Sequence, residues 1–214
     1  ARLRRVSLKE QYDNSTVEEP WVTVDYVDRG LRKYKEANGL FDFTDMLEQF
    51  VQESHRYCPD FDLCFLDEAQ DLSPLQWQIA HLIEKKSKKM YCAGDDDQAI
   101  YKWAGADVHH FITMDSPSET LSQSHRVPKN VHCVAENVAR RIKKRHAKKY
   151  EPRNLDGQVE RIWDINQLDM SEGEWLILAQ AGYQLSPVKN TLRSNGLLFE
   201  YRGSRSINEK ISIA

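Results

Sequence analysis

The feature that most constrains the fold is an alternation of short apolar runs with helical patterns. Residues 61–66 (FDLCFL) form an apolar run preceded by Pro and Asp, and residues 90–93 (MYCA) form a second one. Both runs are typical of buried strands. Between them, Ser73-Pro74 predicts the start of a helix, because Ser favours the N-cap and Pro the first helical position. This alternation predicts an α/β fold with a parallel sheet flanked by helices.

The same alternation extends along the rest of the chain. Further helices are expected over 22–37, from Asp42, from Pro128 and over 186–195. Four residues of the helix from Pro128 are expected to face inward: Val131, Val134, Val138 and Ile142. Further strands are expected at 119–121, 159–163, 175–179 and 198–201. The pattern breaks near residues 122–130, which predicts two α/β units joined there.

The composition fits a folded protein and argues against a membrane protein. The chain has 214 residues, of which 40% are hydrophobic, and a formal net charge of -3. Its longest clearly apolar stretch, 175–179, is far shorter than the ~20 residues of a membrane-spanning helix. The basic start lacks the apolar segment of a signal peptide and lacks Met, which suggests a piece of a longer chain. The four cysteines form no CxxC pair and have no His partner at zinc spacing, so we expect no cysteine-ligated metal site and no disulfide framework, and a reducing, intracellular setting.

The charge is unevenly distributed, and the middle of the chain is basic. Residues 76–150 carry 14 basic and 8 acidic side chains, although the whole chain is slightly acidic. This suggests a local contact with a polyanion. Half of those basic residues lie in the run 140–149. A solvated helix end is the simpler interpretation of this run, and direct contact with phosphates is the alternative.

Two acidic segments carry the chemistry, and the first follows the apolar run 61–66 directly. Asp67 and Glu68 are therefore expected at the carboxyl edge of the sheet, where open α/β folds bind ligands. An Asp there can hold Mg²⁺, and a neighbouring Glu can take a proton from water. Taken alone, solvated acids at the end of a strand are an equally simple explanation.

The second segment, 94–106 (GDDDQAIYKWAGA), follows the apolar run 90–93. Gly94 allows a turn, three acids crowd together, and Gln98 can sense a phosphate by hydrogen bonding. Tyr101 and Trp103 are unusually large aromatic residues for a loop. Trp103 can stack on a base, or alternatively it can cover the core as a lid.

Together these segments resemble the superfamily 1 DNA helicases of the UvrD/PcrA/Rep type. The resemblance rests on four stretches in the family's order, which are 41–47 (FDFTDML), 67–71 (DEAQD), 94–106 and 121–126 (LSQSHR). Weaker likeness extends through 175–179 and 201–203. The order and the spacing of these four stretches agree with those of the family.

The resemblance implies two incomplete RecA-like lobes of the P-loop NTPase type, with parallel sheets flanked by helices. Residues 1–40 would be the end of an inserted helical subdomain. Residues 41–125 would belong to the first RecA-like motor domain, and residues 126–214 would start the second. The bound cofactors would be ATP and Mg²⁺.

The resemblance also implies roles for residues of the nucleotide site. Asp67 would bind Mg²⁺, and Glu68 would activate the hydrolytic water. Gln98 would couple the γ-phosphate to the DNA groove. Two further residues would organise the acidic site, Gln70 and Asp71.

Residues near the next stretch would contact the nucleotide and the DNA. Arg126 would act as an arginine finger, and His125 stands where the family usually has a Tyr that stacks on adenine. Trp103 would stack on a base of single-stranded DNA, with Tyr101 and Lys102 beside it. Ala104 stands where the family often has an Arg, which removes one cation from the DNA site.

The sequence contains no G-x-x-x-x-G-K-[ST] loop to cradle phosphates. We therefore expect a central piece of a helicase, unable to hydrolyse ATP unaided, whose partners are single-stranded DNA, duplex junctions, the remainder of the helicase chain and replication or repair proteins. The expected location is the cytoplasm of a bacterial or phage-infected cell, or its nucleoid. A catalytically inactive, helicase-like DNA-binding or scaffold subunit is the alternative, and an unrelated nucleotide-handling α/β enzyme is the third. The acidic pair with Gln98 and Arg126 favours the motor over the scaffold.

Overall fold

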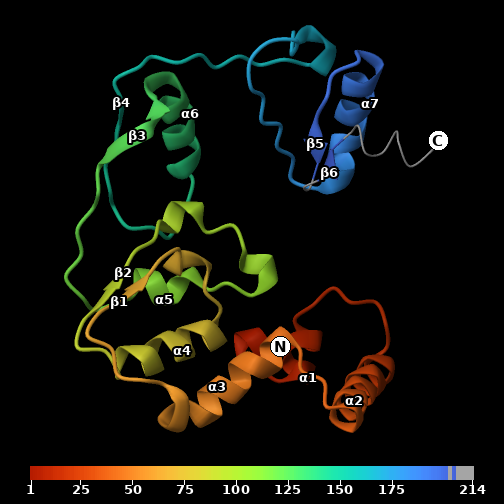
Figure 1. The fold of residues 1–214 in the computed structure, drawn as a ribbon, viewed down its shortest axis with the longest axis vertical. Helices are drawn as coiled ribbons and strands as arrows, with labels where there is room; N and C mark the ends of the chain where they lie inside the picture. Colours follow the sequence, from red (N-terminus) through yellow and green to blue (C-terminus); the bar gives the residue numbers. More distant parts are fainter. Residues whose placement is uncertain (202–203, 206–214) are drawn as a thin grey trace. The chain divides into compact units, whose positions relative to one another are not determined.

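The computed structural model describes residues 1–201 and 204–205, and the chain divides into two compact units, 1–156 and 157–214 (Figure 1). Both units mix helices with pairs of short strands. The predicted boundary at residue 125 lies inside the first unit. The assignment of 1–40, 41–125 and 126–214 to parts of a helicase stays a prediction. Among the described residues, no helix is both long and apolar enough to cross a membrane.

The first strand pair of unit 1 confirms the predicted parallel arrangement. Strands β1 (Cys64–Leu66) and β2 (Met90–Cys92) pair in parallel, with Cys64 opposite Met90. Helix α4 (Pro74–Glu84) connects them, and the side chains of Ser73 and Gln76 form a capping box at its start. The residues after β1 and the residues after β2 therefore leave the same edge of the sheet.

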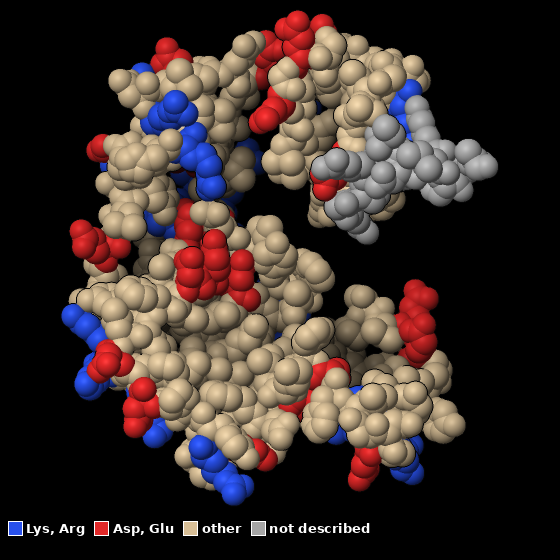
Figure 2. Space-filling view, in the orientation of Figure 1, with Lys and Arg blue, Asp and Glu red and all other residues tan. Residues whose placement is uncertain are grey.

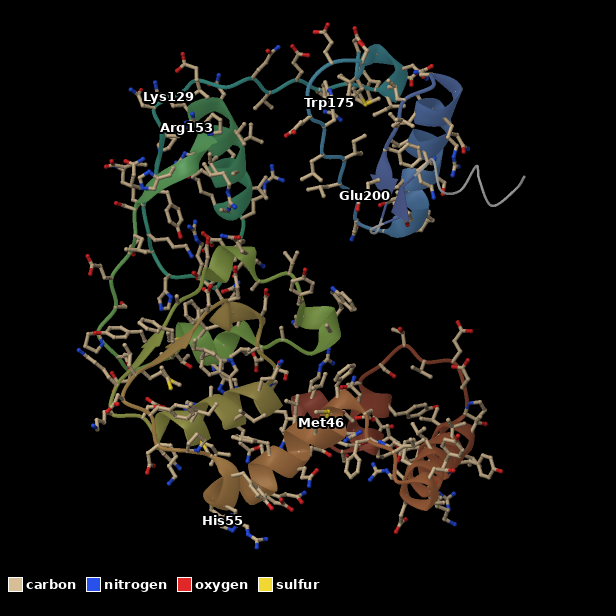
Figure 3. The ribbon with its side chains drawn as sticks, viewed as in Figure 1. Met46, His55, Lys129, Arg153, Trp175 and Glu200 are labelled. Carbon is tan, nitrogen blue, oxygen red and sulfur yellow. The ribbon has the colours of Figure 1, made fainter. Side chains whose placement is uncertain are left out.

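The helices before β1 also follow the sequence pattern. Helix α2 (Trp21–Asn38) ends at Gly39, whose left-handed backbone (φ 61°) is the usual helix C-cap. Helix α3 (Phe43–Tyr57) begins at a capping box formed by Asp42 and Asp45. Met46, labelled in Figure 3, lies on α3 and is exposed. The chain starts with the short elements η1 (Arg2–Arg4) and α1 (Leu8–Asp13).

The core of unit 1 is small and lies against the strand pair. It consists of Ala69, Trp77 and Ala80, with Leu66, Leu72, Cys92 and Phe111 packed against them. Phe111 belongs to α5 (Val108–Ile112), which follows the loop after β2. The core therefore packs the turn after β1 and helix α5 against helix α4 and the two strands.

The second strand pair of unit 1 corrects part of the prediction. Residues 119–121 form no strand, because the strand lies later, as β3 (Gln123–Pro128), where β4 (Glu151–Arg153) supplies parallel backbone partners. Helix α6 (Lys129–Ala139) starts after Pro128 as expected. Lys129 and Arg153 lie near each other at this end of the pair (Figure 3).

The predicted inward face of α6 is wrong in the described structure. The valines of this face, Val131, Val134 and Val138, are 38%, 48% and 59% exposed, and Ile142 lies beyond the helix end at 36%. The reason is that a pair of short strands covers only a narrow stripe of a helix. Burying the whole face would need a wider sheet than residues 1–201 provide.

The second unit departs further from the pattern. Helix α7 (Ser186–Ser194) forms as expected, and β5 (Glu200–Tyr201) falls within the expected 198–201 strand. Its pairing with β6 (Ser204–Arg205) is antiparallel, which contradicts a parallel sheet here. Residues 159–163 and 175–179 form no strand, because no described segment pairs with their backbone groups. The weak likeness at 201–203 extends outside the described residues.

Candidate functional site

The candidate site begins at the carboxyl end of β1, where two carboxylates reach solvent. Asp67 and Glu68 are both exposed. Glu68 has a left-handed backbone (φ 52°, ψ 39°), which is uncommon for a residue with a side chain and is often found at functional sites. The backbone N–H of Glu68 donates to Oδ1 of Asp67 at 2.9 Å. The turn after β1 therefore fixes both carboxylates on the surface of the sheet edge.

Gln70 connects this turn to the loop after β2. Its side chain is 1% exposed and lies in η2 (Ala69–Asp71). The Nε2 of Gln70 donates to Oε2 of Glu68 at 2.7 Å, and its Oε1 accepts from the backbone N–H of Asp95 at 2.9 Å. A buried amide with both ends satisfied holds the two acidic segments in one hydrogen-bonded arrangement.

Gly94 is needed for this close approach. A Cβ added at Gly94 would lie 2.6 Å from Oε1 of Gln70. The backbone of Gly94 is not in the left-handed region, so the turn itself does not require glycine. The sequence pattern identified Gly94 as a turn residue, and the structure gives it a packing role instead.

Asp71 is a partly buried carboxyl beside Glu68. Burial raises the pKa of Asp71, and the nearby charge of Glu68 raises it further. One oxygen of Asp71, Oδ1, is buried with no hydrogen-bond partner. A buried, unpaired acceptor beside two exposed carboxylates is an arrangement that a cation or a bound water would satisfy.

The donor chemistry of this edge fits Mg²⁺ held by few protein ligands. Carboxylate oxygens from Asp67 and Glu68 are hard donors of the kind that Mg²⁺ prefers. Among the residues that the structure describes, no group of three His, Cys, Asp or Glu side chains converges as a metal cage. Mg²⁺ is usually bound by one or two carboxylates together with substrate phosphates and water.

The three acids after β2 are tied to the basic run 140–149, which sequence reasoning missed. The Nζ of Lys148 lies 2.6 Å from Oδ1 of Asp95, 3.4 Å from Oδ2 of Asp97, and in direct contact with Asp96. Arg145 Nη2 lies 2.6 Å from Oδ2 of Asp97. The expected solvated helix end is therefore wrong for these two cations, because burial of the acids demands compensating charge. Figure 2 shows acidic side chains gathered over the loops that follow β1 and β2.

The ion pairs shift the pKa values in opposite directions. Burial has the largest single effect and would raise the pKa of Asp95, but the hydrogen bonds from Lys148 and Gln98 and the charge of Lys148 together outweigh it, so the pKa of Asp95 lies below its usual value. Burial likewise lowers the pKa of Lys148, and its bonds to Asp95 and Asp96 raise it above the usual value. Both groups therefore stay charged over the whole neutral range.

Gln98 lies at the end of η3 (Asp96–Gln98), and its side chain is oriented by Asp95. The Nε2 of Gln98 donates to Oδ2 of Asp95 at 2.6 Å, while Gln98 itself is exposed. Gln98 is thus connected to Glu68 through Asp95 and Gln70. The structure brings these predicted site residues together.

His125 and Arg126 are not brought to the acidic pair. Both lie in β3 and both are exposed. Within residues 1–201, Arg126 makes no hydrogen bond or ion pair with Asp67, Glu68 or Gln98. Their predicted contacts with a nucleotide stay predictions.

The aromatic residues of the loop lie in the open. Trp103, in η4 (Lys102–Ala104), is 79% exposed, which rules out the core-lid interpretation. Tyr101 is 45% exposed, and its ring lies 6.2 Å from the Trp103 ring, measured between centroids. The exposed faces of the two rings are available for stacking.

A cleft of about 500 Å³ adjoins Trp103, and sequence reasoning missed it. Its walls include Arg4 from η1, Arg32 from α2, and Trp103 itself. Arg4 donates from Nη2 to the backbone carbonyl of Lys102 at 2.9 Å, whereas Arg32 is paired with Asp28. The signal in the sequence was the basic start, RLRR, which has no acidic residue until Glu10.

Comparison with known proteins agrees with the resemblance. The model of the UvrD/REP helicase N-terminal domain family matches residues 3–119. A "Probable DNA helicase II homolog" of Rickettsia conorii is 24% identical over 201 residues, which covers 82% of this chain and 30% of that protein. The ATP-dependent DNA helicase PcrA of Staphylococcus epidermidis is 26% identical over 173 residues, which covers 75% of this chain and 24% of that protein. The chain thus spans less than a third of the length of these relatives.

Proposed function

The chain belongs to the UvrD/REP helicase N-terminal domain family, and we propose that the complete protein is an ATP-dependent DNA helicase. In this proposal the protein couples ATP hydrolysis to movement on single-stranded DNA and to unwinding of duplex. Residues 41–125 would be part of the first RecA-like motor domain, residues 126–214 would start the second, and residues 1–40 would be the end of an inserted helical subdomain. The names of the relatives support this proposal.

The proposed ATPase chemistry uses the acidic pair after β1. Asp67 would hold Mg²⁺, whose charge would stabilise the phosphate oxygens of ATP. Glu68 would accept the proton of the attacking water. The Gln70 hydrogen bond occupies Oε2 of Glu68 and leaves its Oε1 to take the proton.

The other nucleotide contacts are assigned to exposed side chains. Gln98 would hydrogen-bond the γ-phosphate, in an orientation supported by its bond to Asp95. Arg126 would compensate charge on the transferred phosphoryl group, and His125 would stack on the adenine. Both residues of β3 are accessible, as these roles require.

The proposed DNA contacts lie at the far end of the same loop. Trp103 would stack on a base of single-stranded DNA, with Tyr101 and Lys102 beside it. Its exposure and the arginine-lined cleft next to it support this assignment. Duplex junctions and replication or repair proteins would be further partners, and the cytoplasm or nucleoid would be the location.

The single observation that carries the proposal is the buried Gln70 bridge. It links the proposed general base, Glu68, to the loop that bears both the phosphate sensor and the exposed Trp103. A network of this kind can transmit the state of a nucleotide to bound DNA.

The test is the substitution Glu68→Gln in the complete protein. ATP turnover should fall by roughly 10²- to 10⁴-fold, the usual contribution of a general base, while nucleotide binding is retained. Unchanged steady-state turnover would exclude Glu68 as the base. A wild-type protein that binds DNA but never hydrolyses ATP would instead identify the helicase-like scaffold.

A further inference from the structure

The most deeply buried charge cluster of the first unit centres on Lys148. Its ammonium group contacts three carboxylates, those of Asp95, Asp96 and Asp97. The side chains of Lys148 and Asp96 are only 7% and 2% exposed. Charges removed from water to this extent are stable only in close mutual contact, so the loop geometry depends on the ammonium.

One of these carboxylates also orients the proposed phosphate sensor. Asp95 Oδ1 binds Lys148, Oδ2 accepts from Gln98, and the backbone N–H donates to Gln70. Lys148 therefore fixes Asp95, which contacts both Gln98 and the buried Gln70 bridge to Glu68.

Lys148 also lies next to the strand pair that carries Arg126. Two residues separate Lys148 from the start of β4, and β4 pairs with β3 in parallel, with Gln123 opposite Glu151. The backbone N–H of Glu151 donates to the carbonyl of Ser122 at 2.8 Å. The segment from Lys148 to β4 is thus tied to the acidic loop at one end and to β3 at the other.

The segment has a second tie to the acidic loop. Arg145 pairs with Asp97, and the backbone N–H of His146 donates to Oδ2 of Asp96 at 2.7 Å. Lys149, directly after Lys148, is exposed and makes no ion pair in the described part of the chain. The contact is therefore specific to one of two adjacent lysines.

We propose that Lys148 is a positioning residue of the proposed ATPase site, coupling the Gln98 loop to the strand that carries Arg126. The inference rests on the proposed function. Without the ammonium, three neighbouring carboxylates repel one another, and the buried Asp96 loses its compensating cation. Asp95 then no longer holds Gln98 in one orientation, and the segment before β4 loses its attachment to the loop.

The test compares Lys148→Met with Lys149→Met in the complete protein. Lys148→Met should lower the ATPase kcat by about 10- to 100-fold, the range expected when reacting groups are misplaced, with KM for ATP changed less than about threefold. Lys148→Arg should recover part of kcat, because Arg keeps the charge. Lys149→Met should leave both constants unchanged.

A second readout does not depend on activity. Amide hydrogen exchange of residues 95–103 and of residues 123–128 should both accelerate in Lys148→Met, without nucleotide, and in Lys149→Met neither should change. If Lys148→Met is too unstable to purify, Asp95→Asn should produce the same paired acceleration.

The two readouts separate failure of the inference from failure of the proposed function. An inactive wild-type protein would contradict the ATPase proposal. The hydrogen-exchange comparison alone would then show whether Lys148 couples residues 95–103 to residues 123–128. Acceleration confined to 95–103, or an equal effect of Lys149→Met, would overturn the role of Lys148.

Discussion

The loop from Gly94 to Ala106 consists of two halves that differ sharply in burial. In the acidic half, 95–98, Asp96 is 5% exposed and is held by the ammonium of Lys148, 52 residues away, and by the backbone N–H of His146. In the aromatic half, 100–103, Ile100 and Trp103 are 68% and 79% exposed. One short loop thus contains a fixed end and an accessible end.

The difference matches what the two proposed ligands require. A phosphate sensor works only when its donor is held in one place, because catalysis depends on geometry. A stacking platform needs an exposed ring that a base can approach. A rigid attachment at one end lets a change at the phosphate reach the aromatic end, and the following predictions test each half separately.

The largest expected effect concerns the fixed half. Lys148→Met should lower the unfolding free energy by about 3–5 kcal/mol, the cost of leaving a buried charge without its partner. Chemical denaturation, with Lys149→Met as the exposed control, measures this. Equal stability of the two variants would mean that the acidic half is not fixed by Lys148.

The next effect concerns the close approach at Gly94. Gly94→Ala would place a Cβ 2.6 Å from Oε1 of Gln70 and should destabilise by about 1–3 kcal/mol, as overpacking does. Gly30→Ala, on α2, meets nothing within 4 Å and should be neutral or slightly stabilising. Thermal melting distinguishes the two variants, and indistinguishable melting temperatures would remove the packing role of Gly94.

The accessible half should respond in DNA binding rather than in stability. Trp103→Ala should weaken single-strand binding by roughly 5- to 150-fold, since stacking on an aromatic contributes ~1–3 kcal/mol. Trp163 is 80% exposed in the second unit, so Trp163→Ala is a matched control. Fluorescence anisotropy beside a thermal melt measures both properties. A Trp103→Ala variant that melts early but binds DNA normally would contradict the stacking role.

The ion pairs of the fixed half should also limit the pH range over which the protein is most stable. The pKa of Asp95 is lowered by Lys148, so its stabilisation is present above the unfolded pKa near 4 and is lost as pH falls further. The pKa of Lys148 is raised by its carboxylate partners, so its contribution is present below about 10.4 and is lost as pH rises through the raised value. Melting temperature against pH should therefore fall at both ends, and Lys148→Met should flatten both limbs. Identical profiles would exclude the coupling.

The smallest effect is expected at the cleft beside Trp103. Arg4→Ala should weaken single-strand binding by about two- to fivefold and reduce the salt slope of the affinity by roughly one. Arg5 is exposed and does not line the cleft, so Arg5→Ala is the control. Equal salt slopes for the two variants would mean that single-stranded DNA does not contact this cleft.

The local signals in the sequence predicted much of the fold of the first unit. Ser73, Asp42 and Gly39 occupy helix ends because their side chains or backbones satisfy end groups, which depends only on near neighbours. The apolar run 175–179 failed as a strand because pairing needs a partner segment, and local composition cannot supply one. The predicted burial of the apolar face of α6 was wrong for the same reason, since local composition cannot supply a neighbouring sheet to cover it.

The candidate site was predictable in its parts but not in its connections. Asp67, Glu68, Gln98 and Trp103 were identified from sequence. The structure adds that Gln70 and Asp95 connect Glu68 to Gln98, and that Trp103 is exposed. The contact of Lys148 with Asp96 spans 52 residues, and nothing local distinguishes Lys148 from Lys149. Only the folded chain selects between them.

The most direct test of the account is the stimulation of ATP hydrolysis by single-stranded DNA in the complete protein carrying Trp103→Ala. If the loop couples a fixed phosphate sensor to an exposed stacking platform, the stimulation should disappear while hydrolysis without DNA stays near the wild-type rate. Full stimulation in this variant, or loss of both activities in proportion to a lower melting temperature, would contradict the account.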